Sequence, residues 1–173
     1  MGFRVAIPDP EHPNVARVSA YAAARGVHLA VRRFPAGTRT ADDAARAIGV
    51  VVGQIVKSLV FRAADETVVV LCSGAVRVDE RRLAAALGLA AVRRATADEA
   101  KAATGFAIGG VPPFAHATAC RVACDRTLLG FDVVWAASGL PDAVFPIAPA
   151  DLVRLSAATV VDVATEVRAT LDA

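Results

Sequence analysis

The sequence contains few aromatic residues and few cysteines. Phe, Tyr and Trp make up 5% of the 173 residues, and alanine inflates the 55% hydrophobic content. The three cysteines are an odd number, which argues against a disulfide framework. No apolar run approaches the roughly 18 residues that a membrane span needs, and residues 1–10 lack the apolar core of a secretory signal. We therefore expect a single cytoplasmic domain with a sizeable core and no membrane partner.

Several motifs that mark common enzyme classes are also missing. There is no Gly-x-Gly-x-x-Gly fingerprint and no Walker loop, so we expect no nucleotide cofactor. There is no Gly-x-Ser-x-Gly elbow and no recognisable nucleophile beside a base. The net charge of +2 is too small to indicate a strong nucleic-acid binder. The arginine pairs at 32–33, 81–82 and 93–94 could form part of a basic face, or they could be ordinary solvated residues.

The segment from Thr40 to Gly49 has the pattern of a short helix with both ends specified. Thr40 is a good N-cap, and Asp43 lies three residues later, where a carboxylate can reach the free amides. Ala41, Ala44, Ala45 and Ile48 then fall on one apolar stripe at helical spacing. Gly49 supplies a residue that can adopt the left-handed conformation at the C-terminus.

The next segment, residues 55–61, alternates like a strand and contains an unexpected lysine. Apolar residues share the face of Lys57, and Ser58 lies between valines on the other, so both faces are nearly all apolar. Desolvating an ammonium costs several kcal/mol. Lys57 therefore either extends its amine to the sheet edge and buries only its stem, or it places a cation at the floor of a pocket. There it could bind a carbonyl or phosphate, or act as a base.

The segment Gly109-Gly110-Val111-Pro112-Pro113 cannot form regular secondary structure, because paired glycines precede paired prolines. It is either a rigid turn between a helix and the next strand or a binding loop. In the second case Gly109, Gly110 and Val111 would present bare backbone N–H groups to a carbonyl oxygen or a phosphate.

A metal site is suggested by His116, Cys120 and Cys124, which repeat at a spacing of four residues. Residues 118–125 have the pattern of a strand, however, where four residues span about 13 Å. Three groups so far apart cannot hold one ion, and a structural zinc site usually needs four ligands. We therefore expect no metal, and His116 alone stays a candidate for lining a pocket beside the glycine loop.

The remaining pattern mixes hairpins with crossover helices. Helices are expected to begin near Pro13, Asp79, Thr96 and Pro149. Further strands are expected over 27–34, 67–72, 91–94, 118–125, 131–137, 143–147 and 159–163. The order predicts one α+β domain with a mixed, curved sheet over residues 13–163, an irregular lead-in over 1–12 and a peripheral tail over 164–173.

Three segments of this chain resemble the YbaK-type aminoacyl-tRNA deacylases, the free-standing relatives of the editing domain of bacterial prolyl-tRNA synthetases. They are Thr-Ala-x-x-Ala-Ala with Ile-Val-Lys-Ser-Leu-Val-Phe (40–61), the Gly-x-x-x-Pro loop within Gly105–Phe114, and the strand and turn Val134–Gly139. The resemblance implies a barrel-like sheet flanked by helices. It also implies hydrolysis of the ester that joins a wrong amino acid to the 3′ acceptor end of a tRNA, with a synthetase as a candidate further partner.

The resemblance also implies roles for individual residues. Lys57 would be the essential amine that holds the terminal nucleotide or the ester carbonyl, and Ser58 would help orient the substrate. The loop around the scissile carbonyl would run from Gly109 through Gly110 and Val111 to Pro113. Because no nucleophile is recognisable, such a site must position water or use the substrate's own groups.

Some pocket positions differ from the family's pattern. Phe34 stands where some relatives have a tyrosine, and Phe145 stands where the alanine-specific branch has a histidine. Ala137 and Val144 stand near a serine and an aspartate of the cysteine-specific branch. The substrate is therefore left as a small residue such as Ala, Cys or Ser. Two other functions stay open, a non-catalytic module that binds tRNA or a synthetase and a hydrolase of free small esters.

Overall fold

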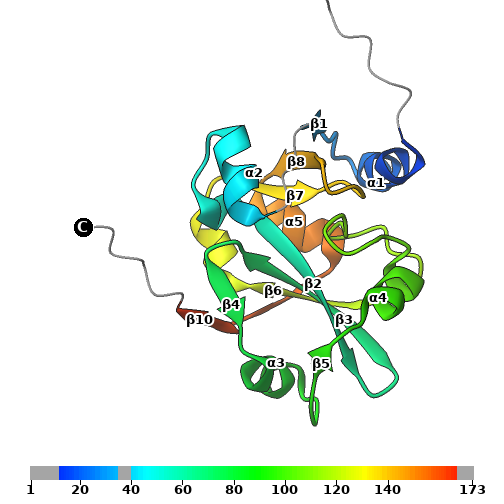
Figure 1. Cartoon of the computed structure of the whole chain (residues 1–173), viewed down its shortest axis with the longest axis vertical. Coiled ribbons are helices and arrows are strands. Elements are labelled where there is room, and N and C mark those ends of the chain that lie inside the picture. Colours follow the sequence, from blue (N-terminus) through cyan, green and yellow to red (C-terminus); the bar gives the residue numbers. More distant parts are fainter. Residues whose placement is uncertain (1–11, 35–39, 167–173) are drawn as a thin grey trace, which may run out of the picture.

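The computed structural model describes residues 12–34 and 40–166 (Figure 1). The helices are α1 (Pro13–Ala23), α2 (Ala41–Ile48), α3 (Glu80–Leu87), α4 (Ala97–Thr104) and α5 (Pro149–Ser156), with 3-10 helices η1 (Val52–Gln54) and η2 (Arg126–Gly130). The strands are β1 (Arg32–Arg33), β2 (Val56–Ala63), β3 (Glu66–Ser73), β4 (Val76–Val78), β5 (Arg93–Arg94), β6 (Arg121–Asp125), β7 (Val134–Ala137), β8 (Ala143–Ile147), β9 (Thr159–Val161) and β10 (Ala164–Glu166). Within this part of the chain, the helices are too short or too polar to cross a membrane.

The strands form three sheets rather than one. The largest has the order β5-β2-β3-β6-β9 and is mixed, because β2 is antiparallel to β3 and β5 whereas β6 is parallel to β3 and β9. The other two have the orders β1-β8-β7 and β10-β4. The α+β class is confirmed. A barrel-like sheet is not, because among the described residues β7 meets β2 only through an isolated bridge between Ile55 and Trp135.

The predicted helix after Thr40 is confirmed at both ends. The Thr40 hydroxyl accepts a hydrogen bond from the N–H of Asp43 at 3.1 Å, which satisfies one of the free amides of the first turn. Gly49 closes α2 with a φ of +85°, in the left-handed region that glycine adopts without strain. The apolar stripe of α2 packs with Ile55, Trp135 and Val144, so the helix lies beside the start of β2.

β2 is covered on both faces, as its apolar pattern predicts. On one face Val56 and Val60 join a core cluster that includes side chains from α1, α4 and α5. On the other face Phe61 packs with Leu83 of α3 and with neighbouring valines of β3. Figure 1 shows the β2–β3 pair crossing the middle of the molecule, with α3 below it. A strand in this position has little contact with water, which explains its composition.

Several predicted boundaries are wrong. The expected strand over 27–34 is reduced to Arg32–Arg33, because only these residues find a partner in β8. The strands over 118–125, 131–137 and 159–163 begin later or end earlier, at 121–125, 134–137 and 159–161. The short strands β4 and β10 were not predicted; they pair with each other, so the expected tail begins with a strand. The lead-in lies outside the described residues except for His12, the N-cap of α1.

A buried carboxylate fixes the end of the central sheet. Asp125, at the end of β6, is 1% exposed. Its Oδ1 accepts hydrogen bonds from the N–H groups of Val163 at 2.9 Å and Ala164 at 3.2 Å. Its Oδ2 accepts from the N–H and the hydroxyl of Thr127. Asp125 therefore joins β6, η2 and the segment between β9 and β10.

Replacing this carboxylate should destabilise the fold. Asp125→Ala leaves the N–H groups of Val163 and Ala164 without acceptors, so we expect the free energy of unfolding to fall by about 3 kcal/mol. Asp162→Ala is the matched control, because Asp162 is exposed and only pairs with Arg126 at 2.9 Å. It should cost less than about 1 kcal/mol. Urea unfolding measures both, and equal effects would contradict the role given to Asp125.

Candidate functional site

A cavity of about 350 Å³ lies along one edge of β2. Its walls come from α2, β2, the end of β5, the glycine loop, β7 and the turn before β8. Most of the lining is apolar and includes Ala44, Val56, Trp135 and Val144. No acidic side chain of the described residues lines it. The cavity therefore suits a small, mostly apolar group.

The cavity exists because part of β2 has no neighbouring strand on this side among residues 12–34 and 40–166. β5 pairs with β2 only at Phe61 and Arg62, and the N–H of Ala95 donates to Val60 O at 2.9 Å. Residues two apart in a strand direct their backbone groups to the same edge. The peptide N–H and C=O of Ser58 therefore also point to the cavity side, where β5 has already ended. This exposed peptide edge can bind a polar group of a ligand.

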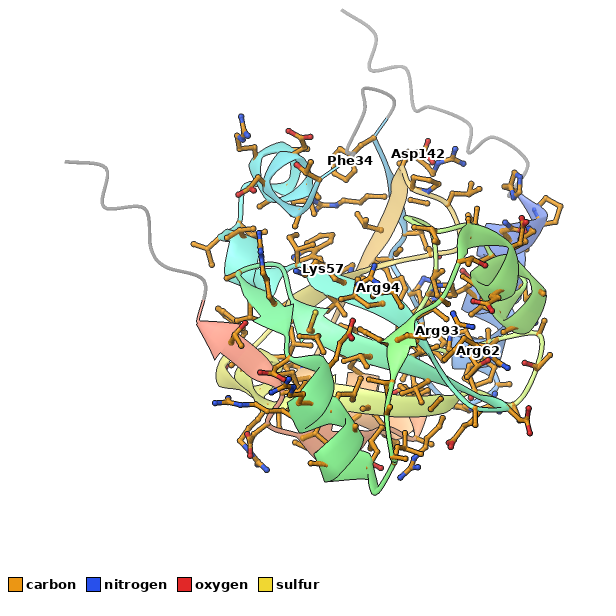
Figure 2. The ribbon with its side chains drawn as sticks, turned by 60° about the horizontal axis from the view of Figure 1, so that its bottom comes forward. Phe34, Lys57, Arg62, Arg93, Arg94 and Asp142 are labelled. Atoms are coloured by element: carbon orange, nitrogen blue, oxygen red, sulfur yellow. The ribbon has the colours of Figure 1, made fainter. Side chains whose placement is uncertain are left out.

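Lys57 brings a positive charge to the cavity wall. Its Nζ donates a hydrogen bond to the carbonyl oxygen of Val76 in β4 at 2.7 Å, and the side chain is half-buried. It therefore does not simply extend from the sheet edge into solvent, and the ammonium has donor capacity left for a ligand. In Figure 2 Lys57 lies beside Arg94, which also lines the cavity.

The residue opposite Lys57 in β3 does not neutralise it. Cys72 is paired with Lys57 in the β2–β3 register and is fully buried. Burial raises the pKa of the Cys72 thiol to about 11, so the thiol is uncharged at pH 7. The positive charge of Lys57 is therefore available to an anionic or carbonyl oxygen.

Ser58 carries a hydroxyl whose hydrogen-bonding capacity is unused. Its Oγ is buried and has no hydrogen-bond partner among the described residues. Ser58 also lines the cavity. A buried hydroxyl without a partner costs free energy, and a polar ligand group could remove that cost. The Oγ of Ser138, in the turn between β7 and β8, is also buried without a hydrogen-bond partner among the described residues, but Ser138 does not line the cavity.

The glycine loop reaches the cavity through Gly109 and Val111. The N–H of Gly110 donates to Ala107 O at 3.0 Å, so the prediction that all three residues present bare N–H groups is wrong for Gly110. Gly110 instead packs against the turn before β8. A Cβ there would lie 3.0 Å from two backbone carbons of Leu140. Gly110 thus sets the distance between the loop and the turn, while its neighbours face the ligand space.

Of the other predicted site residues, one lines the cavity and three do not. Ala137 lines the cavity. Phe34 packs beside α2, and its N–H donates to Asp142 O at 2.8 Å. Phe145 and Pro113 are buried and do not line the cavity.

His116 supports the glycine loop instead of lining the cavity. Its Nε2 lies 2.7 Å from the carbonyl oxygen of Pro112. Burial lowers the pKa of His116 below its ordinary value of 6.5, so the neutral ring donates from Nε2 at pH 7. The residue therefore acts on the site through the loop.

The lining residues that the sequence did not identify as site residues include Arg94, Ile108 and Trp135. In the sequence, Arg94 was noted only as one of a pair of arginines, and Trp135 only as part of the strand that resembles the family. Ile108 precedes Gly109 and is 52% exposed. A large apolar residue directly before a glycine loop was the available signal for it.

The arrangement favours chemistry on a carbonyl or phosphate group. A cation, the peptide edge at Ser58 and the loop residues Gly109 and Val111 surround a small cavity that no acidic side chain of the described residues lines. Such donors stabilise negative charge that develops on oxygen. No group of three His, Cys, Asp or Glu side chains in the described residues could hold a metal ion. The described residues that line the cavity also include no Ser–His or Cys–His pair.

Comparisons with known proteins agree on one family. A family model described as "Aminoacyl-tRNA editing domain" matches residues 35–155. An uncharacterized protein of Bacillus subtilis, YwhH, is 32% identical over 73% of this chain and 80% of its own length. A proline–tRNA ligase of Lactobacillus gasseri is 36% identical over 54% of this chain but only 17% of the ligase.

Solved structures have the same fold. A protein proposed as a trans-editing enzyme for prolyl-tRNA synthetase is 44% identical, with a TM-score of 0.84 over 89% of this chain and 98% of the other. The hypothetical protein APE2540 is 31% identical, with a TM-score of 0.80 over 86% of this chain and 99% of the other.

The close approach at Gly110 can be tested by substitution. In Gly110→Ala the new Cβ would meet backbone atoms of Leu140, so loop or turn must shift, and we expect a loss of about 1–3 kcal/mol in the free energy of unfolding. Gly130→Ala is the matched control, since a Cβ there meets nothing within 4 Å. Urea unfolding distinguishes them. A Gly110→Ala variant as stable as the control would show that the loop is not held against the turn.

Proposed function

Because this chain belongs to the aminoacyl-tRNA editing domain family, we propose that it hydrolyses the ester joining a wrongly attached small amino acid to the 3′ end of a tRNA. The observation that carries the proposal is Lys57, a cation hydrogen-bonded at the wall of a small apolar cavity whose described lining residues include no acidic side chain. Selective hydrolysis is useful in translation because a binding pocket distinguishes small side chains by only ~10–200-fold per methylene.

The size and lining of the cavity support a small amino acid. About 350 Å³ must accommodate the ester and part of the terminal ribose beside the side chain. Val56, Trp135 and Val144 give that side chain apolar surroundings. An apolar pocket rejects an added hydroxyl only weakly, by about 100-fold, and the unpaired Oγ of Ser58 offers a hydroxyl a partner. Alanine, cysteine and serine are therefore all substrates to test.

The reaction is an attack of water on the ester carbonyl carbon. The carbonyl oxygen gains negative charge, which Lys57 and the N–H groups of Gly109 and Val111 would stabilise. The bond from the carbonyl carbon to the ribose oxygen then breaks, and that oxygen takes a proton. The products are the free amino acid and a tRNA with a free 3′ end. Since no side-chain base lines the cavity among the described residues, the substrate's own amino or hydroxyl group orients the water.

The proposed partner is the 3′ acceptor end of an aminoacyl-tRNA. The chain resembles both a protein proposed as a trans-editing enzyme for prolyl-tRNA synthetase and a segment of a proline–tRNA ligase. This double likeness supports a domain that acts beside a synthetase. It also supports a location with the translation machinery in the cytoplasm.

The function is tested with a panel of tRNAs charged with Ala, Cys or Ser and a bulky control charged with Phe. We expect release of at least one small amino acid and slower release of Phe, because the aromatic ring would have to share about 350 Å³ with the ester and part of the ribose. Release of labelled amino acid measures turnover. Binding of tRNA without turnover would support a non-catalytic module instead, and cleavage of small free esters alone would support the third function.

Loss of the Lys57 amine should abolish hydrolysis with the fold intact. Lys57→Ala removes the cation from the cavity wall, so we expect kcat to fall by at least about 100-fold. Lys101→Ala is the matched control, because the Lys101 amine also donates to a backbone carbonyl, Gly105 O at 3.1 Å, but lies outside the cavity. It should keep turnover within about twofold. Circular dichroism checks the fold, and retained turnover in Lys57→Ala would remove Lys57 from the mechanism.

A further inference from the structure

A groove of about 330 Å³ lies next to the cavity, on the far side of Lys57. Residues of β2, β4, β5 and the first turn of α3 line it. Lys57, Leu59 and Arg94 line both the groove and the cavity, so the two spaces are adjacent. A ligand whose end occupies the cavity can therefore extend along the groove.

The described residues that line the groove carry more positive than negative charge. Lys57, Arg77 and Arg94 line it, and Glu80 is its single acidic residue among the described ones. The guanidinium of Arg77 is exposed and makes no hydrogen bond or ion pair with a described residue. That of Arg94 lies over the ring of Phe61 at 5.3 Å and has no carboxylate partner in the same part of the chain. Both arginines thus have free donors.

Two nearby arginines, Arg93 and Arg33, are each paired with a carboxylate. Arg93 pairs with Glu99 through two short hydrogen bonds, at 2.7 and 2.9 Å. At the other end of the cavity, where Pro141 lines it, Arg33 pairs with Asp142 at 2.8 Å. In Figure 2 Arg94 lies close to Lys57, and Asp142 lies apart from both. Arg32, in the same strand as Arg33, lies over the Trp135 ring at 5.1 Å and has no ion pair with a described residue. The described arginines near the site that lack a carboxylate partner are therefore Arg77 and Arg94 at the groove and Arg32 beside Trp135.

We propose that this groove binds the phosphates of the nucleotides that precede the terminal adenosine, with Arg77 as a phosphate-binding residue. The inference rests on the proposed function, which places the aminoacyl end in the cavity. A single-stranded 3′ end carries a phosphate at every nucleotide, and the planar fork of arginine matches a phosphate group. The acceptor strand then leaves the cavity past Lys57 and runs between β5 on one side and β4 and α3 on the other.

Glu80 lowers the affinity of the groove for phosphate. Its carboxylate, in the first turn of α3, faces the same space as Arg77. Like charges repel, so a phosphate bound beside Arg77 is held less tightly than the cations alone would hold it. Weak binding of the strand favours release of the deacylated tRNA.

Substrates with and without phosphates test this path. We expect Arg77→Ala to lower kcat/KM by about tenfold for a charged tRNA and for an aminoacylated CCA trinucleotide. The same variant should leave the 3′-aminoacyl-adenosine unchanged, because that substrate has no phosphate. Arg25→Ala is the control for net charge, since Arg25 lies on the Tyr21 ring at 3.5 Å, after the end of α1. An equal effect of Arg77→Ala on all three substrates, or on none, would overturn the proposal.

Binding of uncharged RNA gives a readout that does not need hydrolysis. Fluorescence anisotropy with a CCA-ended oligonucleotide should show the slope of log K against log salt reduced by about 0.7 in Arg77→Ala, the value for one phosphate contact on a single strand. Glu80→Gln should bind the oligonucleotide more tightly. If both variants change RNA binding in this way but the protein deacylates no charged tRNA, the proposed function is wrong and the RNA-binding role of the groove stands. If neither variant changes RNA binding, the proposed phosphate-binding role of the groove is wrong, whatever the hydrolysis assay gives.

Discussion

The hydrogen bond from the Lys57 amine to the Val76 carbonyl is the constraint on which the site depends. β2 is covered on both faces, and its cavity edge stays without a partner strand between Trp135 and β5. At that edge a long cationic side chain would otherwise sample many rotamers. The bond of 2.7 Å to β4 holds the ammonium at the boundary between an apolar cavity and a polar groove. The charge therefore stands where an ester and a phosphodiester would meet.

The two sides of Lys57 have opposite character, and this gives the site a direction. The cavity side is apolar and closed by the glycine loop, whereas the groove side is open and lined by arginines without acidic partners. The buried thiol of Cys72 stays uncharged beside Lys57, so it does not reduce the contrast. A ligand with an apolar end and an anionic chain fits only one way round. An aminoacyl-tRNA end has this form.

Local sequence predicted the elements whose signals are complete within a few residues. The limits of α2, α3 and β8 follow from a cap, a glycine or a change of period, and the structure has them as expected. The anomaly of Lys57 among apolar neighbours also pointed to the correct strand. The alternation over 27–34 misled, because a strand also needs a partner, and only residues 32 and 33 have one.

The finer features of the site depend on contacts between residues far apart in the chain. Gly110 approaches Leu140, and Lys57 is bonded to Val76, but no short pattern announces either contact. The acceptor for Lys57 is a peptide carbonyl, which every amino acid supplies. An uncharged side chain that keeps β4 extended can therefore occupy position 76 and leave the acceptor for the ammonium in place. Mutational drift among uncharged residues at that position thus preserves the acceptor, since the main chain supplies it.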